Sequence, residues 1–176
     1  HRLHEGAAQG NPHRLRPDRH HLAQNSQAVQ QLRDRKHRFE KPLALMVRDL
    51  DTAGKLAYLN EEEKVLLAGL QRPIVLCPKK EDAGISALVS LDNNYLGLLL
   101  PYSPLHEILF RMGNFDALVM TSANMSEEPI CHQNEECRQR LGRVADYFLE
   151  HDRDIYIRCD DSVMRVSKEQ PVFIRR

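Results

Sequence analysis

From residue 25 onward, helix signals and short apolar runs alternate along the chain. The clearest helix start is Ser103–Pro104, a capping serine followed by a proline that suits the first helical position. Apolar residues then recur at i, i+3, i+4 and i+7 as far as Gly113, which predicts one helix. Leu96–Leu100 is too apolar for a strand that faces water. Helices alternate with strands at first and strands dominate later, which predicts an α/β fold with a mixed sheet.

The same signals give bounds for the other elements. We predict a first helix that is capped by Asn25 or Ser26. A second helix is capped by Asn60 and ends near Leu70, and a third is capped by Asn134 and ends at Gly142. We predict strands at Leu43–Val47, Pro73–Cys77, Leu96–Leu100, Ala117–Met120, Tyr147–Leu149, Ile155–Ile157, Val163–Val166 and Val172–Ile174.

The first 24 residues lack this patterning. Residues 1–21 hold five of the nine histidines and show no period of a helix or a strand. We therefore expect residues 1–24 to be a disordered or non-native leader and residues 25–176 to form one domain. Residues 1–41 contain nine Lys or Arg against four Asp or Glu, although the chain of 176 residues is neutral overall. The basic charge is thus confined to one segment, which argues against a broad basic surface that binds nucleic acid.

The apolar runs and the cysteines exclude some classes of protein. The longest uncharged apolar run, residues 96–105, is far shorter than the roughly 20 residues that span a bilayer. The four cysteines form no CxxC pair and no zinc spacing, which is typical of reduced thiols. We therefore predict a cytoplasmic protein with no membrane partner and no resident metal.

Three cations, Lys36, Arg38 and Lys41, stand at the junction of the first helix and the first long strand. Favourable charge at the negative helix end explains Lys36 well but the other two poorly. The alternative is a phosphate clamp, in which arginine makes planar bidentate contacts and lysine supplies a point charge. The residues alone leave both interpretations open.

Thr121-Ser122-Ala123-Asn124 forms a second candidate site because it directly follows an apolar strand. Ligands of open α/β sheets bind beyond the carboxyl ends of strands. An ordinary Ser or Asx turn is the alternative. Asp160-Asp161-Ser162 fits either a metal-holding carboxylate pair or a hairpin turn, and the turn is the preferred interpretation.

Five ordered blocks carry a family resemblance over residues 28–176. They are LRDRKHRFEKPLALMVRD, GLLLPYSPLHEILF, ALVMTSANMSEEPICHQNEE, ADYFLEHDRDIYIRCDDSVMRV and the terminal FIRR. Together they resemble the YrdC-like, adenylate-forming domain of the hydrogenase maturation carbamoyltransferases, the HypF family. The resemblance implies a twisted mixed α/β sheet with flanking helices and a concave, basic cleft.

The resemblance also implies which residues bind ATP. Lys36, Arg38 and Lys41 match the basic motif of the family and are its catalytic cations, and Ser122-x-Asn124 matches its motif after a strand. The implied ATP-binding residues are Lys36, Arg38, Lys41, Thr121, Ser122, Asn124, Ser162 and Arg175.

The implied reaction joins carbamate and ATP into carbamoyl-adenylate and pyrophosphate, with Mg²⁺ held largely by the phosphates. In the complete proteins of this family the carbamate comes from carbamoyl phosphate. The carbamoyl group then passes to the C-terminal cysteine of a hydrogenase maturation partner and becomes a cyanide ligand of the nickel–iron site. A double-stranded RNA-binding module of the same fold is an alternative from a different class.

A sister family, the threonylcarbamoyl-adenylate synthases, is the second alternative. It usually carries Arg-x-Pro-x-His-Pro where this chain has Leu100-Pro101-Tyr102-Ser103-Pro104, which argues against threonine as a substrate. The chain also departs from the family pattern, since the first strand of the domain has no counterpart before Asn25. The acylphosphatase, zinc-finger and transferase domains of the complete proteins have no counterpart either. We therefore expect a fragment that forms carbamoyl-adenylate weakly or not at all and does not transfer the carbamoyl group to the partner's cysteine.

Overall fold

The computed structural model describes residues 3–5 and 23–176, which form two compact units. The sheet unit contains residues 23–30, Glu40–Thr121 and Asp161–Arg176. The small unit contains Leu3–Glu5, Gln31–Phe39 and Ser122–Asp160. The expected leader falls mostly outside the described residues.

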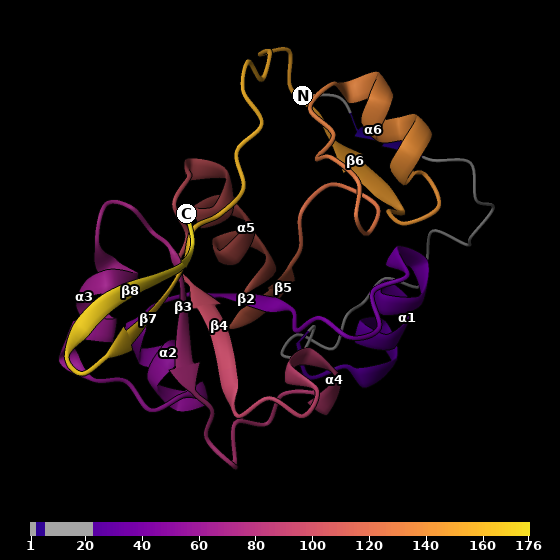
Figure 1. Cartoon of the computed structure of the whole chain (residues 1–176). Coiled ribbons are helices and arrows are strands. Elements are labelled where there is room, and N and C mark those ends of the chain that lie inside the picture. The colour runs from indigo at the N-terminus through magenta and orange to yellow at the C-terminus, as the bar shows by residue number, and fades with distance from the viewer. Residues whose placement is uncertain (1–2, 6–22) are drawn as a thin grey trace. The chain divides into compact units, whose positions relative to one another are not determined.

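A six-stranded mixed sheet forms the centre of the sheet unit (Figure 1). Its strand order is β5-β2-β4-β3-β7-β8, in which β2 runs parallel to β4 and β3 parallel to β7, while the other neighbours are antiparallel. The strands are β2 (Ala44–Val47), β3 (Ile74–Pro78), β4 (Tyr95–Leu99), β5 (Ala117–Met120), β7 (Val163–Ser167) and β8 (Gln170–Arg175). The predicted mixed α/β fold is confirmed.

Helices pack against the sheet because its central strands β2 and β4 bury apolar side chains. They are α2 (Leu50–Leu56), α3 (Glu61–Ala68), α4 (Ala87–Ser90) and α5 (Pro104–Gly113). Met46 of β2 and Leu99 of β4 pack with Phe110 of α5, and all three are almost fully buried. Leu45 and Val47 alternate with Met46 along β2, so they point to the other face, and they are also buried.

Local capping explains where the helices begin. The predicted cap on Asn60 is confirmed, and Asn60 and Glu63 form a reciprocal capping box at the start of α3. The side chain of Ser103 accepts a hydrogen bond from the His106 N–H at 3.3 Å, and Pro104 is the first residue of α5. These bonds satisfy N–H groups that have no partner within the helix.

The small unit combines the end of one helix with a helix and a two-stranded ribbon. Helix α1 (Ser26–Lys36) begins in the sheet unit and ends here. Helix α6 (Asn134–Leu141) precedes β6 (Tyr147–Leu149), which pairs antiparallel with β1 (Leu3–Glu5).

Four expectations about the elements need correction. The segment 155–157 is no strand, because its apolar side chains are exposed and none of the strands that the structure describes pairs with it. Residues 160–162 form neither a strand nor a turn and lead directly into β7. Asn134 is the first residue of α6 rather than its cap, and its side-chain amide donates to the His151 carbonyl. The short helices α2 and α4 are additional.

Helix α5 keeps much of its apolar stripe at the surface. Leu105, Ile108, Leu109 and Met112 are 40–84% exposed, whereas Phe110 is 2% exposed. In the part of the chain that the structure describes, no helix has both the length and the apolar character that a bilayer crossing requires.

Candidate functional site

Helix α1 ends in a sharp turn that presents basic residues. His37 adopts the left-handed conformation with φ of 50°, and the His37 N–H donates to the Asp34 carbonyl at 3.2 Å. The Arg38 N–H donates to the Arg33 carbonyl at 2.9 Å. This pair of bonds is a Schellman motif with a histidine where glycine is usual. The turn places Lys36 on the last helical turn and Arg38 immediately beyond it.

Lys36 is anchored at both ends to the loop that follows β5. Its side chain is buried, and its Nζ donates to the Ser122 carbonyl at 2.6 Å. The Ser126 hydroxyl donates to the Lys36 carbonyl at 2.8 Å, so it satisfies an acceptor that the helix end leaves open. Within the small unit the structure therefore brings the first basic residue to the second candidate motif.

The 122–128 loop is held by its own side chains. The Ser122 hydroxyl donates to Asn124 Oδ1 at 2.7 Å, and the Asn124 side-chain amide donates to the Glu128 carbonyl at 2.7 Å. The Asn124 N–H also donates to the Ser122 carbonyl, at 2.9 Å. These local bonds match the ordinary-turn alternative. They also hold in place the Ser122 carbonyl, which accepts the hydrogen bond from Lys36 Nζ.

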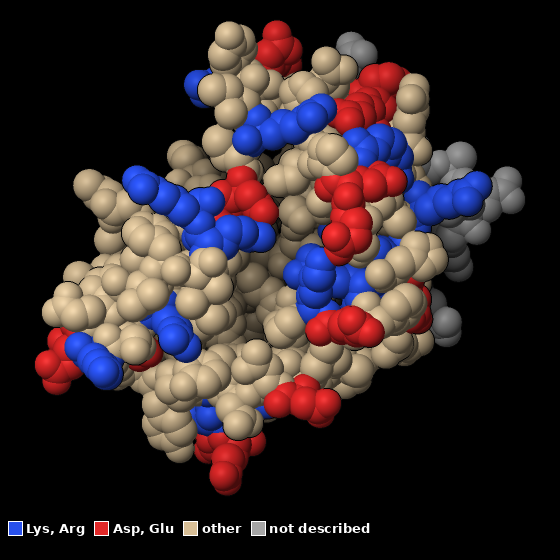
Figure 2. All heavy atoms as spheres, viewed as in Figure 1, with Lys and Arg blue, Asp and Glu red and all other residues tan. Residues whose placement is uncertain are grey.

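Ion pairs connect this loop to α6. Arg140 pairs with Glu128 of the loop and with Glu136 of its own helix, and Arg138 pairs with Glu135 and Glu150. Figure 2 shows acidic and basic side chains next to one another over the part of the surface that carries α6. The pairs are exposed to solvent, which screens them, so they contribute little to stability.

Arg33 is a component of this site that the sequence interpretation missed. It is 2% exposed, and its Nη1 donates to the Arg38 carbonyl at 2.7 Å. Val29, Arg33 and Lys36 recur at i, i+4 and i+7 and all three are buried, but Ala28, Leu32 and Arg35 follow the same spacing. Burial, and no signal in the sequence, therefore distinguishes Arg33 from the neighbouring Arg35, whose side chain is 29% exposed and pairs with Asp146.

The basic side chains at this helix end disfavour one another's charge. Burial, with a smaller contribution from the nearby Arg38, lowers the pKa of Lys36 to about 8, while Cys131 acts in the opposite direction. Burial and Arg38 also lower the pKa of Arg33. Positive charge is therefore concentrated where solvent stabilises it poorly. A bound polyanion would relieve that repulsion.

The other predicted residues lie in the sheet unit, in two separate groups. Thr121 directly follows β5, whose end pairs with the start of β2, and the exposed Lys41 lies shortly before β2. Ser162 directly precedes β7, and Arg175 of β8 donates to the Asp161 carbonyl at 2.9 Å. Three strand intervals, or roughly 14 Å, separate the axes of β2 and β7. These strands run antiparallel, so the two groups also lie at opposite ends of the sheet. Their assignment to ATP stays a prediction.

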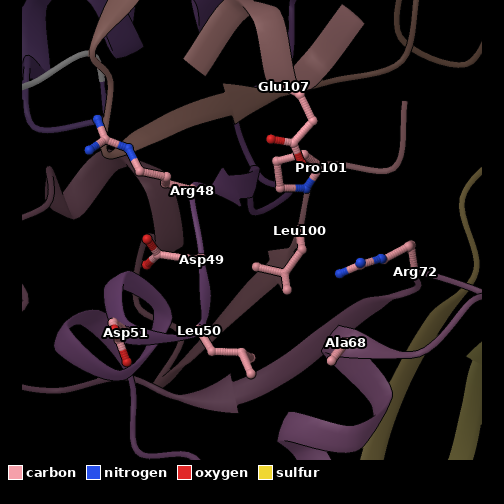
Figure 3. Close-up of a pocket in the computed structure, with 9 residues that line it drawn as sticks. All are labelled: Arg48, Asp49, Leu50, Asp51, Ala68, Arg72, Leu100, Pro101 and Glu107. Carbon is pink, nitrogen blue, oxygen red and sulfur yellow. The ribbon is translucent and has the colours of Figure 1, made fainter. Parts of the chain in front are cut away.

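A pocket of about 390 Å³ in the sheet unit contains none of the predicted residues (Figure 3). Its lining includes Arg48, Arg72 and Asp49. Arg48 Nε donates to the Phe115 carbonyl at 2.9 Å, and Arg72 Nη1 donates to the Leu67 carbonyl at 3.2 Å. Asp49 caps α2. Each of these three charged side chains already has a structural partner, so the pocket gives no indication of a ligand.

Comparisons with known proteins identify the family. The sequence profile of Sua5_yciO_yrdC, described as "Telomere recombination", matches residues 21–176. The chain belongs to the Sua5/YciO/YrdC family. Carbamoyltransferase HypF2 of Cupriavidus necator is 43% identical over 171 residues, which cover 88% of this chain and 21% of that protein. Carbamoyltransferase HypF of Rhizobium leguminosarum is 42% identical over 160 residues, with the same coverage.

Solved structures of the Sua5/YciO/YrdC family support the same assignment. Full-length HypF in the phosphate- and nucleotide-bound form is 42% identical, with a TM-score of 0.84 over 88% of this chain and 20% of that one. Sua5 of P. abyssi complexed with L-threonine is 19% identical with a TM-score of 0.70, over 87% of this chain and 45% of that chain, which shows a shared fold. The predicted resemblance to the YrdC-like domain of HypF is confirmed, and the chain spans about a fifth of the length of the carbamoyltransferases that it matches.

Proposed function

We propose that the chain binds the phosphates of ATP at the end of α1 and uses them to form carbamoyl-adenylate. The observation that carries this proposal is the group of Arg33, Lys36 and Arg38, two of which are buried although they repel a common neighbour. Lysine and arginine side chains grouped in this way suit phosphate binding, because both make charge-assisted hydrogen bonds to phosphate oxygens. The HypF structure that the chain resembles is described as phosphate- and nucleotide-bound.

The proposed reaction suits a site that is rich in cations. A carbamate oxygen attacks the α-phosphorus of ATP, a bond forms between them, and the bond to the β-phosphate oxygen breaks with release of pyrophosphate. Carbamate is already an anion, so no general base is needed. Negative charge develops on the phosphates, and fixed N–H donors of lysine and arginine stabilise it. Mg²⁺ would enter with ATP as part of the substrate, held by the phosphates.

In a longer protein this reaction would be one step of carbamoyl transfer. The relatives named carbamoyltransferase favour carbamate over threonine as the acyl substrate. Carbamoyl phosphate would supply the carbamate, and the C-terminal cysteine of a hydrogenase maturation partner would receive the carbamoyl group. Delivery of a cyanide ligand to a nickel–iron site would be the final purpose.

Calorimetric titration with ATP tests the phosphate-binding part of the proposal. A charge-assisted hydrogen bond is worth about 1.5–3 kcal/mol, so Arg38→Ala should raise the Kd of ATP by roughly tenfold to a hundredfold. Arg35→Ala is the matched control, because this arginine lies on the same helix but pairs with Asp146. We expect the control to retain wild-type affinity. Unchanged affinity in Arg38→Ala would overturn the assignment.

Isotope exchange between ATP and pyrophosphate tests the reaction. Ammonium bicarbonate solutions contain carbamate in equilibrium, so they supply the acyl substrate without an additional enzyme. We expect exchange that requires carbamate and is lost in Arg38→Ala. A protein that binds ATP but shows no carbamate-dependent exchange would refute adenylate formation by this chain.

A further inference from the structure

Arg33 makes a contact whose purpose is not explained by folding of α1 alone. Arg33 is 2% exposed, and its Nη1 donates to a carbonyl five residues ahead, on Arg38. A helix end can be closed by backbone bonds, as it is here by the Schellman pair. The additional bond is therefore not required to end the helix.

Two hydrogen bonds join Arg33 to the backbone N–H and the backbone carbonyl of Arg38. The Arg38 N–H donates to the Arg33 carbonyl at 2.9 Å, and Arg33 Nη1 donates to the Arg38 carbonyl at 2.7 Å. The segment enters from His37 in the left-handed region, which is unfavourable for a residue with a side chain. Without the guanidinium bond, this segment would have less to hold it in that conformation.

We propose that Arg33 is a positioning residue, which holds the backbone of Arg38 so that the Arg38 guanidinium faces the phosphates of ATP. This inference rests on the proposed function. Arg33 itself does not need to touch the nucleotide. The effect is expected to be large because small displacements of a binding group are costly when the contact is directional.

A double-mutant cycle separates positioning from a general structural role. The variants are Arg33→Met, Arg38→Ala and the double variant, with Kd measured by calorimetry for ATP and for adenosine. Arg33→Met removes the donor but keeps an unbranched side chain of similar length. Arg35→Met is the matched control, because it removes an equally basic side chain from the same helix. The Arg35 side chain bonds to Asp146 and to the Val144 carbonyl rather than to Arg38.

Positioning predicts effects that are not additive. We expect Arg33→Met to raise the Kd of ATP roughly tenfold while the Kd of adenosine, which has no phosphates, stays unchanged. In the Arg38→Ala background the same substitution should add less than about twofold. Arg35→Met should leave both affinities unchanged.

The outcomes distinguish this inference from the proposed function. If Arg38→Ala binds ATP as tightly as wild type, the proposed function fails. If Arg38→Ala weakens binding but Arg33→Met does not, or if the two effects simply add, the positioning role is wrong. Equal loss of ATP and adenosine affinity in Arg33→Met would indicate a structural role and would also refute it.

A second variant keeps the test decisive if Arg33→Met does not fold. Arg33→Lys keeps the buried charge but has a compact ammonium in place of the planar fork. We expect folded Arg33→Lys to bind ATP several-fold more weakly than wild type, with a loss that again disappears in the Arg38→Ala background. Wild-type affinity in this variant would overturn the role of the guanidinium geometry.

Discussion

The lowered pKa of Lys36 makes ATP affinity and stability respond to pH in opposite directions. Burial, supported by repulsion from Arg38, lowers this pKa from 10.5 to about 8. At pH 7 the side chain is mostly an ammonium and can bind phosphate. As the pH rises through 8 the folded protein loses this charge, while the unfolded chain keeps it up to about pH 10.5. The unfolded state therefore binds more protons in this window, and stability rises with pH across it.

The size of the affinity change follows from the charged fraction. With a pKa near 8, about nine-tenths of the molecules carry the ammonium at pH 7 and about one-tenth carry it at pH 9. If only the charged form binds, the apparent Kd of ATP rises about tenfold between these two pH values. The free energy of unfolding should rise by up to roughly 1 kcal/mol over the same interval.

Calorimetry at pH 7, 8 and 9 measures the Kd, and urea unfolding measures the stability. Lys36→Arg is the control, because arginine keeps its charge throughout and should show a Kd that is almost constant with pH. In two buffers of different ionisation enthalpy, wild type at pH 8 should take up protons when it binds ATP. A wild-type Kd with the same pH dependence as that of Lys36→Arg would refute the reasoning.

Three further predictions concern the helix end and the substrate. His37→Gly should keep or raise the free energy of unfolding, by up to about 1 kcal/mol, because glycine adopts the left-handed conformation without strain. His37→Val should lower that free energy. Urea unfolding of both variants measures the order, and a valine variant more stable than the glycine variant would contradict the turn geometry. Ser126→Ala should cost about 1 kcal/mol, since it removes the donor to the Lys36 carbonyl; thermal unfolding at unchanged Tm would show that the bond contributes nothing. Threonine should not stimulate ATP–pyrophosphate exchange. The buried Leu100 cannot pair with the carboxylate of threonine, and the side chain of Ser103 caps α5. Clear stimulation by threonine would reverse the substrate assignment.

Elements with local signals could be predicted from the sequence. The start of α5 needs only a capping serine and a proline, and both act within one turn. The strand at 155–157 was predicted wrongly because three apolar residues specify a strand only when a neighbour pairs with them. Helix α2 was missed although Asp49 accepts from the Thr52 N–H, because so short a helix shows little periodicity.

The candidate site was predictable in composition but not in its internal connections. A cluster of cations indicates phosphate binding without showing which of them are buried. The bond from Lys36 Nζ to the Ser122 carbonyl joins segments far apart in the sequence, so no local rule could give it. Arg33 and Arg35 are chemically alike in a basic run, and only the buried face of α1 separates their roles.

The strand order of the sheet has a consequence for synthesis on the ribosome. Strand β3 lies in the middle of the sheet, but β7, its parallel neighbour, comes after every other element of the sheet except β8. Until those residues leave the ribosome, the fully buried Val75 and Cys77 belong to a strand whose outer N–H and C=O groups have no partner. At about 5–20 residues per second, the nascent chain passes several seconds with this apolar edge open to pairing with other chains. Completion of the sheet therefore waits until β7 and β8 have been synthesised, and the exposed edge of β3 is where a nascent-chain chaperone would be most useful.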